Sequence, residues 1–166
     1  MEPDLGRAMQ IRKHVRANGL ISRVDVLEAA AAVQNGQAKL SASGSSSRIG
    51  DQGAEVALLD LLEMLAARPA EVIKMDIEGS EYAILGDRRF EAVCPRVLIL
   101  EWHKTPEHPD GYDWCCLKLQ ELGYRVVSES GKCPWAGNII AEKGAPAAPR
   151  DIGHGAREFG LAGDSL

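Results

Sequence analysis

Residues 72–81 read VIKMDIEGSE, and this stretch decides the fold. Its first six residues form a short, mostly apolar run, typical of a strand with neighbours on both sides in a parallel sheet. Residues 78–81 then open a helix that continues to about Leu85, because glycine allows a sharp turn at Gly79. We therefore predict that a central strand passes directly into a helix here.

Similar patterns on both sides of this stretch predict an α/β protein with a mainly parallel sheet, because helical and β-rich runs alternate. Strands are predicted at residues 23–27, 37–41, 96–101, 124–128 and 138–142. The last two form an antiparallel pair, since no crossover helix fits between them. Helices are predicted at about residues 5–17, 56–67 and 113–122 from apolar spacing and stop signals such as Asn18-Gly19.

Two stretches are poor in large apolar residues. Residues 41–53 hold five serines and three glycines, and we interpret them as a flexible loop or, alternatively, as a loop that gates substrate access. Residues 143–166 are rich in Gly, Ala and Pro, which predicts a disordered tail. The domain is accordingly expected to span residues 1–142.

Composition excludes several classes of partner. The 166 residues suit one domain, and the net charge of −5 favours neither nucleic acid nor an anionic membrane. No apolar run reaches the ~18 residues needed to span a bilayer. The four cysteines form no C-x-x-C pair, so we expect a reduced, cytoplasmic protein.

Candidate catalytic residues lie at the predicted ends of two neighbouring strands. Asp76 and Glu78 follow the first, and Glu101 and His103 follow the second. Ligands bind beyond the carboxyl ends of parallel strands, so these four side chains are expected to share one crevice. His103 is a candidate general base or, alternatively, a surface histidine in a polar loop at 102–111. We interpret Glu81 as a helix-dipole partner only.

A metal-binding interpretation uses Glu101, His103 and the following loop residues Glu107, His108 and Asp110. Their spacing is irregular and the loop is interrupted by proline, unlike the regular ligand spacing of common metal sites. We therefore assign no metal ligands from the sequence.

The stretch IKMDIEGSEYAIL resembles the signature of FkbM-type methyltransferases, in which a strand ends in K-x-D-x-E-G-x-E. Weaker matches follow in the same order over residues 1–142, among them VLILEWH, LGYRVV and NIIAEK. The resemblance implies a Rossmann-like class I methyltransferase sheet of order 3-2-1-4-5-7-6 with its last strand antiparallel. It also implies S-adenosyl-L-methionine as cofactor and a small-molecule acceptor, a hydroxyl on a sugar or natural-product-like scaffold.

The same resemblance assigns roles to further residues. Glu2 would bind the cofactor ribose, Glu28 and Ala29 would border the adenine, and Asp76 would lie near the methionine end. The family's first strand, its G-x-G loop and most of its second strand would precede Met1, so we expect an N-terminally truncated chain. Such a chain should bind the cofactor with a dissociation constant above ~1 mM and self-associate through an open edge of the signature strand.

Two alternatives remain open at the level of sequence. One is a non-catalytic relic that persists as a binding or interaction module. The other is a Rossmann-like binder of a different nucleotide, which is weaker because neither a P-loop nor G-x-G-x-x-G is present.

Overall fold

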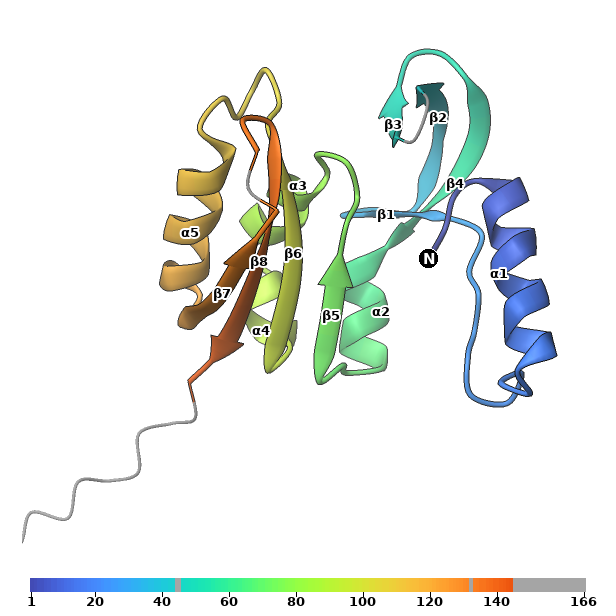
Figure 1. Ribbon diagram of the computed structural model, residues 1–166, viewed down its shortest axis with the longest axis horizontal. Coiled ribbons are helices and arrows are strands. Elements are labelled where there is room, and N and C mark those ends of the chain that lie inside the picture. The colour runs from blue at the N-terminus through green and yellow to red at the C-terminus, as the bar shows by residue number, and fades with distance from the viewer. Residues whose placement is uncertain (44–45, 132, 145–166) are drawn as a thin grey trace, which may run out of the picture.

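The computed structural model describes residues 1–43, 46–131 and 133–144. Within these ranges the chain forms two mixed four-stranded sheets and five helices (Figure 1). The fold class is therefore mixed α/β, as predicted, but the described strands do not form one seven-stranded sheet. Almost all of the predicted tail lies outside the described residues.

Sheet B contains the signature strand. Its order is β5 (Val72–Met75), β6 (Val97–His103), β8 (Ala136–Lys143) and β7 (Tyr124–Ser130). β5 and β6 are parallel, and β8 is antiparallel to both β6 and β7, which confirms the predicted closing pair.

The prediction that β5 is central is wrong, because β5 is an edge strand of sheet B. Its side chains reflect this position, since Val72 is 51% exposed and only Met75 is fully buried. The expectation of an open edge at this strand agrees with the structure of the described residues.

Three helices cover one face of sheet B and build the core. They are α3 (Glu81–Gly86), α4 (Phe90–Val93) and α5 (Gly111–Glu121). The alternate residues Leu98, Leu100 and Trp102 of β6 face them and are buried, as β-strand periodicity requires. On the opposite face, toward the viewer in Figure 1, no helix lies among the residues that the structure describes. The core therefore lies on one side of the sheet.

Sheet A is built from the N-terminal half in the order β1, β4, β2, β3. Its strands are β1 (Ala30–Ala32), β4 (Ala54–Asp60), β2 (Gly36–Ser43) and β3 (Ser46–Gly50). β1 and β4 are parallel and the other pairs are antiparallel. Interpreting residues 41–53 as a loop is therefore wrong for most of that stretch, because backbone pairing forms strands there with Ile49 as the single large apolar residue.

The predicted helix at 56–67 is half strand and half helix. β4 occupies the first part, and α2 (Leu61–Ala67) begins after Asp60. The buried carboxylate of Asp60 accepts hydrogen bonds from the backbone N–H groups of Leu62 and Glu63, which fixes the start of the helix. Apolar spacing alone did not reveal this cap inside the run.

The first helix, α1 (Leu5–Ala17), has the predicted bounds, with Asp4 as its N-cap. The strand predicted at residues 23–27 is wrong. This segment lies beside α1 (Figure 1). The N–H groups of Arg23 and Val24 both donate to the Leu20 carbonyl in a local turn, and the Leu27 carbonyl accepts a hydrogen bond from the Glu2 N–H. These bonds form no ladder, so the alternating pattern has no partner strand to complete it.

Candidate active site

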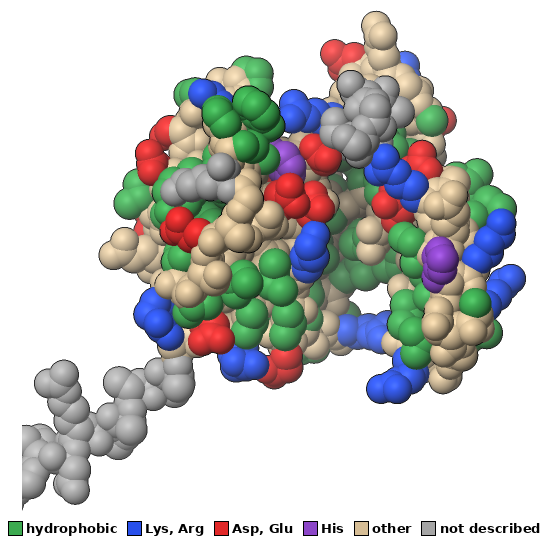
Figure 2. Space-filling view, in the orientation of Figure 1, with side chains coloured by type: hydrophobic (Ala, Val, Ile, Leu, Met, Phe, Trp, Pro, Cys, Tyr) green, Lys and Arg blue, Asp and Glu red, His purple; other side chains and the backbone are tan. Residues whose placement is uncertain are grey.

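The carboxyl ends of β5 and β6 bring together the residues predicted for the site. Met75 pairs with Leu100, so Asp76 and Glu101 follow at neighbouring positions, as expected. His103 lies two residues further along β6. Figure 2 shows acidic side chains and a histidine gathered at the edge of the hollow between the two halves of the molecule.

The turn after β5 has an unusual backbone. Glu78 has a φ of 56° and Gly79 a φ of 108°, and both values lie in the region that disfavours ordinary side chains. A Cβ at position 79 would also lie 3.1 Å from Thr105 Cγ2. Strain of this kind persists where the surrounding structure holds it in place. Here it directs the Glu78 carboxylate toward β6.

The carboxylate that holds this turn belongs to Glu81, which is completely buried. It accepts hydrogen bonds from the backbone N–H groups of Ile77, at 3.2 Å, and Gly79, at 2.7 Å. Its Oε1 also lies 3.0 Å from His103 Nδ1. The interpretation of Glu81 as only a dipole partner is therefore wrong. Its contacts come from residues before it in the chain and from another strand, and helix position does not reveal them.

His103 ends a strand and is buried, so the prediction that it lies in a polar loop is wrong. The Tyr82 hydroxyl donates a hydrogen bond to the His103 carbonyl oxygen. On the imidazole, Nε2 lies 3.5 Å from Glu78 Oε2 and 3.9 Å from Glu101 Oε1. Burial alone would lower the pKa of His103. The Glu81 hydrogen bond and the surrounding carboxylates outweigh burial and raise that pKa above its ordinary value.

Glu101 and Asp76 form the more exposed half of this corner. Lys74 Nζ contacts Asp76 Oδ2 at 3.1 Å. Burial and then the negative charge of Asp76 raise the pKa of Glu101. Perturbed ionisable groups that share a crevice mark a candidate functional site.

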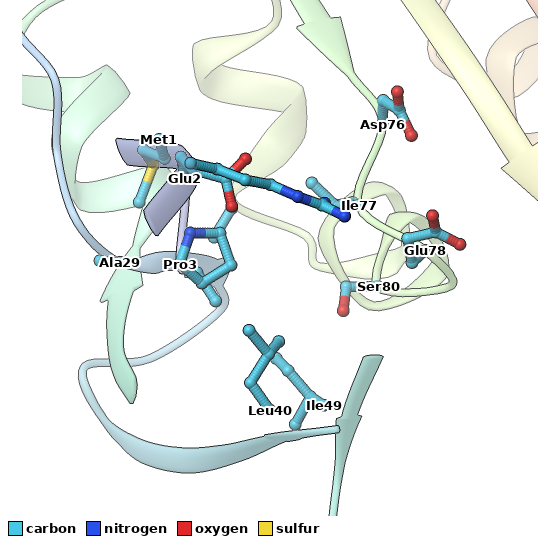
Figure 3. Close-up of a pocket in the computed structure, with 13 residues that line it drawn as sticks. Met1, Glu2, Pro3, Ala29, Leu40, Ile49, Asp76, Ile77, Glu78 and Ser80 are labelled. Carbon is cyan, nitrogen blue, oxygen red and sulfur yellow. The ribbon is translucent and has the colours of Figure 1, made fainter. Parts of the chain in front are cut away.

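A cavity of about 220 Å³ adjoins the corner. It is lined from both halves of the chain, by Met1, Glu2, Pro3, Arg7, Ala29, Ala30, Ala31, Leu40, Ile49, Asp76, Ile77, Glu78 and Ser80. Figure 3 shows that the carboxyl groups of Asp76 and Glu78 point away from Glu2 and Leu40. The cavity therefore has an N-terminal side and, opposite it, a side formed by the turn after β5, which we call the acidic side and whose carboxyl groups are directed away from the N-terminal residues.

Of the residues that the family resemblance assigns to the cofactor, some line this cavity and one does not. Glu2 and Ala29 line the cavity, and Glu2 Oε1 accepts a hydrogen bond from the Asp4 N–H at 2.9 Å. Glu28 is not among the lining residues and instead forms an ion pair with Arg12 at 3.0 Å. Small side chains at 29–31 leave the room that the cavity occupies.

The loop residues of the metal-binding interpretation, Glu107, His108 and Asp110, do not gather around His103. His108 stacks on Tyr82 with ring centroids 3.8 Å apart, and Glu107 and Asp110 are exposed. Among the described residues, a group with metal-ligating atoms close together is Asp76, Glu78 and His103. Sequence spacing could not show this group, because it joins two strands.

The fold and the corner define a mixed α/β protein with an acidic, histidine-containing site at the ends of parallel strands. A family model described as Methyltransferase FkbM domain matches residues 11–126, more than half of the chain. The chain belongs to this methyltransferase family. No curated protein and no solved structure shows significant similarity to it. Among the described residues, no helix has the length and apolarity needed to cross a membrane.

Proposed function

We propose that this protein is an S-adenosylmethionine-dependent methyltransferase that acts on a hydroxyl of a sugar or a natural-product-like small molecule. The observation that carries the proposal is the cavity between Glu2 and the corner formed by Asp76, Glu78, Glu101 and His103. Membership of the methyltransferase family supports the reaction class. The sheet B order β5-β6-β8-β7 also matches the 4-5-7-6 part of the strand order expected for a class I enzyme.

The N-terminal side of the cavity fits an adenosyl group. Glu2 offers a carboxylate, the group that binds ribose hydroxyls in nucleotide-binding sheets. Pro3, Leu40 and Ile49 offer apolar surface, and Ala29 leaves space beside it. When bound, S-adenosylmethionine would supply an electrophilic methyl group. The cavity is smaller than the ~300 Å³ at which typical ligand pockets begin, so we expect weak binding.

The acidic side of the cavity suits the acceptor. A hydroxyl must lose its proton as its oxygen becomes bonded to the methyl carbon, and a group positioned to accept that proton accelerates the step. Asp76 and Glu78 line this side of the cavity, and Glu101 and His103 lie next to them, outside the lining, with His103 Nε2 3.5 Å from Glu78 Oε2. Holding the hydroxyl in line with the methyl group is the second requirement, and the fixed turn at Glu78 provides a rigid wall.

Four free cysteines agree with a reducing compartment such as the cytoplasm.

A titration of the full chain with S-adenosylmethionine, followed by ¹H–¹⁵N NMR, tests the cofactor half. We expect a dissociation constant above ~1 mM, with shifts confined to residues around Glu2, Ala29 and Ile77. Glu28→Gln, outside the cavity lining, is the control and should leave the shifts unchanged, whereas Glu2→Gln should weaken binding. Shifts absent from the cavity at saturating cofactor would overturn the proposal.

Transfer of a radiolabelled methyl group to a panel of sugars and polyols tests the reaction. We expect Asp76→Asn to lower kcat/KM at least ~10-fold, and Glu107→Gln to leave it unchanged. Cofactor binding without transfer to any hydroxyl would favour the non-catalytic binding module instead.

A further inference from the structure

Three side chains that can ligate a metal ion meet at the carboxyl ends of β5 and β6. One ligand atom from each of Asp76, Glu78 and His103 lies within 4.8 Å of the others. Ligand atoms bound at ~2.0–2.2 Å from a cation lie about 3–4.4 Å from one another. Only small side-chain movements therefore separate the observed arrangement from a coordinating one.

The imidazole of His103 supplies an independent observation. Its side chain is 9% exposed, and Nδ1 is occupied by the Glu81 carboxylate. In the part of the chain that the structure describes, no hydrogen bond reaches Nε2, whose neighbours are carboxylate oxygens at 3.5 and 3.9 Å. These distances are too long for a hydrogen bond but match the spacing of two ligands on one ion.

Glu81 has the role of an outer-shell residue in this arrangement. Metal-binding histidines usually donate their other ring N–H to a carboxylate, which fixes the tautomer and aims the free nitrogen at the metal. Glu81 is in turn held by the N–H groups of Ile77 and Gly79. The imidazole is thus locked with Nε2 directed at Glu78 and Glu101.

The negative charge of the three carboxylates at this corner is also only partly balanced by neighbouring cationic side chains. Asp76, Glu78 and Glu101 bring three carboxylates to one crevice, and Lys74 contacts only the first of them. A buried or half-buried group of like charges is costly unless cations balance it. A divalent cation would supply two positive charges between the carboxylates and Nε2.

We propose that Asp76, Glu78 and His103 Nε2 bind a divalent cation, with Glu101 beside them as a further ligand. A mixed set of imidazole and carboxylate ligands suits ions such as Mn²⁺ or Zn²⁺. The proposal deepens the function proposed above and rests on it, because the cation would lie at the turn that forms the acidic side of the cavity. Bound there, it would lower the pKa of an acceptor hydroxyl. The acceptor class that this favours is a hydroxyl with a second oxygen beside it, as in a vicinal diol.

Direct binding of Mn²⁺ to the metal-stripped full chain tests the site without any need for activity. The electron paramagnetic resonance signal of free Mn²⁺ measures the unbound fraction, and the visible absorption of Co²⁺ reports imidazole coordination. We expect saturable binding of roughly one equivalent and loss of the Co²⁺ band in His103→Gln.

Two ligand variants and one control sharpen the test. Glu78→Gly removes a ligand and relieves the left-handed backbone at φ 56°, so the turn should remain folded. Asp76→Asn removes a second, exposed ligand. Each should weaken Mn²⁺ binding at least ~10-fold, since even outer-shell changes have effects of that size. Glu107→Gln changes an exposed acid in the loop after β6 and should leave binding unchanged.

The outcomes separate this proposal from the methyltransferase proposal. Weak binding of Mn²⁺ at several sites would overturn the cation site. Mn²⁺ binding that is unchanged in His103→Gln, Glu78→Gly and Asp76→Asn would overturn it as well. Cofactor binding and methyl transfer in metal-free protein would overturn it as well, while the proposed function would stand. Specific Mn²⁺ binding in a chain whose cavity never responds to S-adenosylmethionine would support the site and refute the methyltransferase role.

Discussion

Replacement of Glu81 is the sharpest perturbation of this fold, because one buried carboxylate connects the turn after β5, the start of α3 and the end of β6. The side chain is completely buried and contacts two backbone N–H groups and the imidazole of His103. Glu81→Ala would leave all three partners without an acceptor. Removing one member of a buried charged pair typically costs about 3–5 kcal/mol of unfolding free energy.

Glu81→Gln is the milder change. Its amide oxygen can still accept a hydrogen bond, but its NH₂ group must face either a backbone N–H or the imidazole. One buried group left unsatisfied costs about 1–3 kcal/mol. For a chain of this length, 1 kcal/mol corresponds to roughly 2–4 °C in Tm, so we expect a loss of about 2–12 °C for Gln and 6–20 °C for Ala.

Thermal and urea unfolding, followed by circular dichroism, measure these losses. Glu91→Gln is the matched control, because Glu91 also lies in the first turn of a helix but is exposed. It should change stability by no more than about 0.5 kcal/mol. A ¹⁵N NMR spectrum of the histidines should in addition show a changed Nδ1 environment for His103 in Glu81→Gln. Equal, small losses of stability in Glu81→Gln and Glu91→Gln would refute the anchoring role of Glu81.

The remaining predictions concern stability, packing and association. Hydrogen bonds from Arg89 lower the pKa of Asp87 to about 2. The stability that this ion pair gives the folded state is therefore fully present above about pH 4 and is lost as the pH falls from 4 to about 2. The Tm difference between wild type and Arg89→Ala should accordingly narrow between pH 4 and pH 2. Gly111→Ala would push a Cβ into the tyrosine hydroxyl that holds the end of β6 and should lower stability by about 1–3 kcal/mol, whereas Gly86→Ala, with nothing within 4 Å, should not destabilise. Val72→Lys places a charge on the open edge of β5 and should reduce concentration-dependent association in sedimentation velocity; unchanged association would place the contact elsewhere.

Much of sheet B could be predicted from the sequence, because its signals are local. The apolar runs of β5 and β6 and the closing pair β7–β8 were found close to their observed bounds. The placement of Asp76 beside Glu101 followed from the general rule for parallel strands. The edge position of β5 could not be found this way, because an apolar run does not report how many neighbours it has.

Sheet A was predicted poorly, since its stability depends on pairing between distant segments. Leu40 pairs with Ile49 and with Ala54, and only this three-strand register turns a serine-rich stretch into strands. Asp60 offers a further case. It lies inside the run predicted as the helix 56–67, but it is buried and bound by the Arg89 guanidinium at 2.8 Å. Contacts between residues 29 positions apart have no signature in local spacing.

The site depends both on local sequence signals and on contacts between distant segments. Its residues could therefore be predicted from the sequence, but their arrangement could not. Asp76, Glu78, Glu101 and His103 stand out as polar residues after apolar runs, so composition and position sufficed to select them. Their mutual geometry depends on Glu81, which a local rule assigned to the helix dipole. The same carboxylate turns His103 from a residue free to exchange protons with solvent into one whose free nitrogen faces fixed acids. A proton or a cation must then satisfy that nitrogen and its acidic neighbours, so the cation-binding measurement also decides how the corner would activate a hydroxyl. If an ion is bound, His103 would hold it and the ion would acidify the acceptor hydroxyl; if no ion is bound, a proton on Nε2 balances the acids, and the carboxylates of Asp76 and Glu101 are the groups left to accept the proton of the hydroxyl.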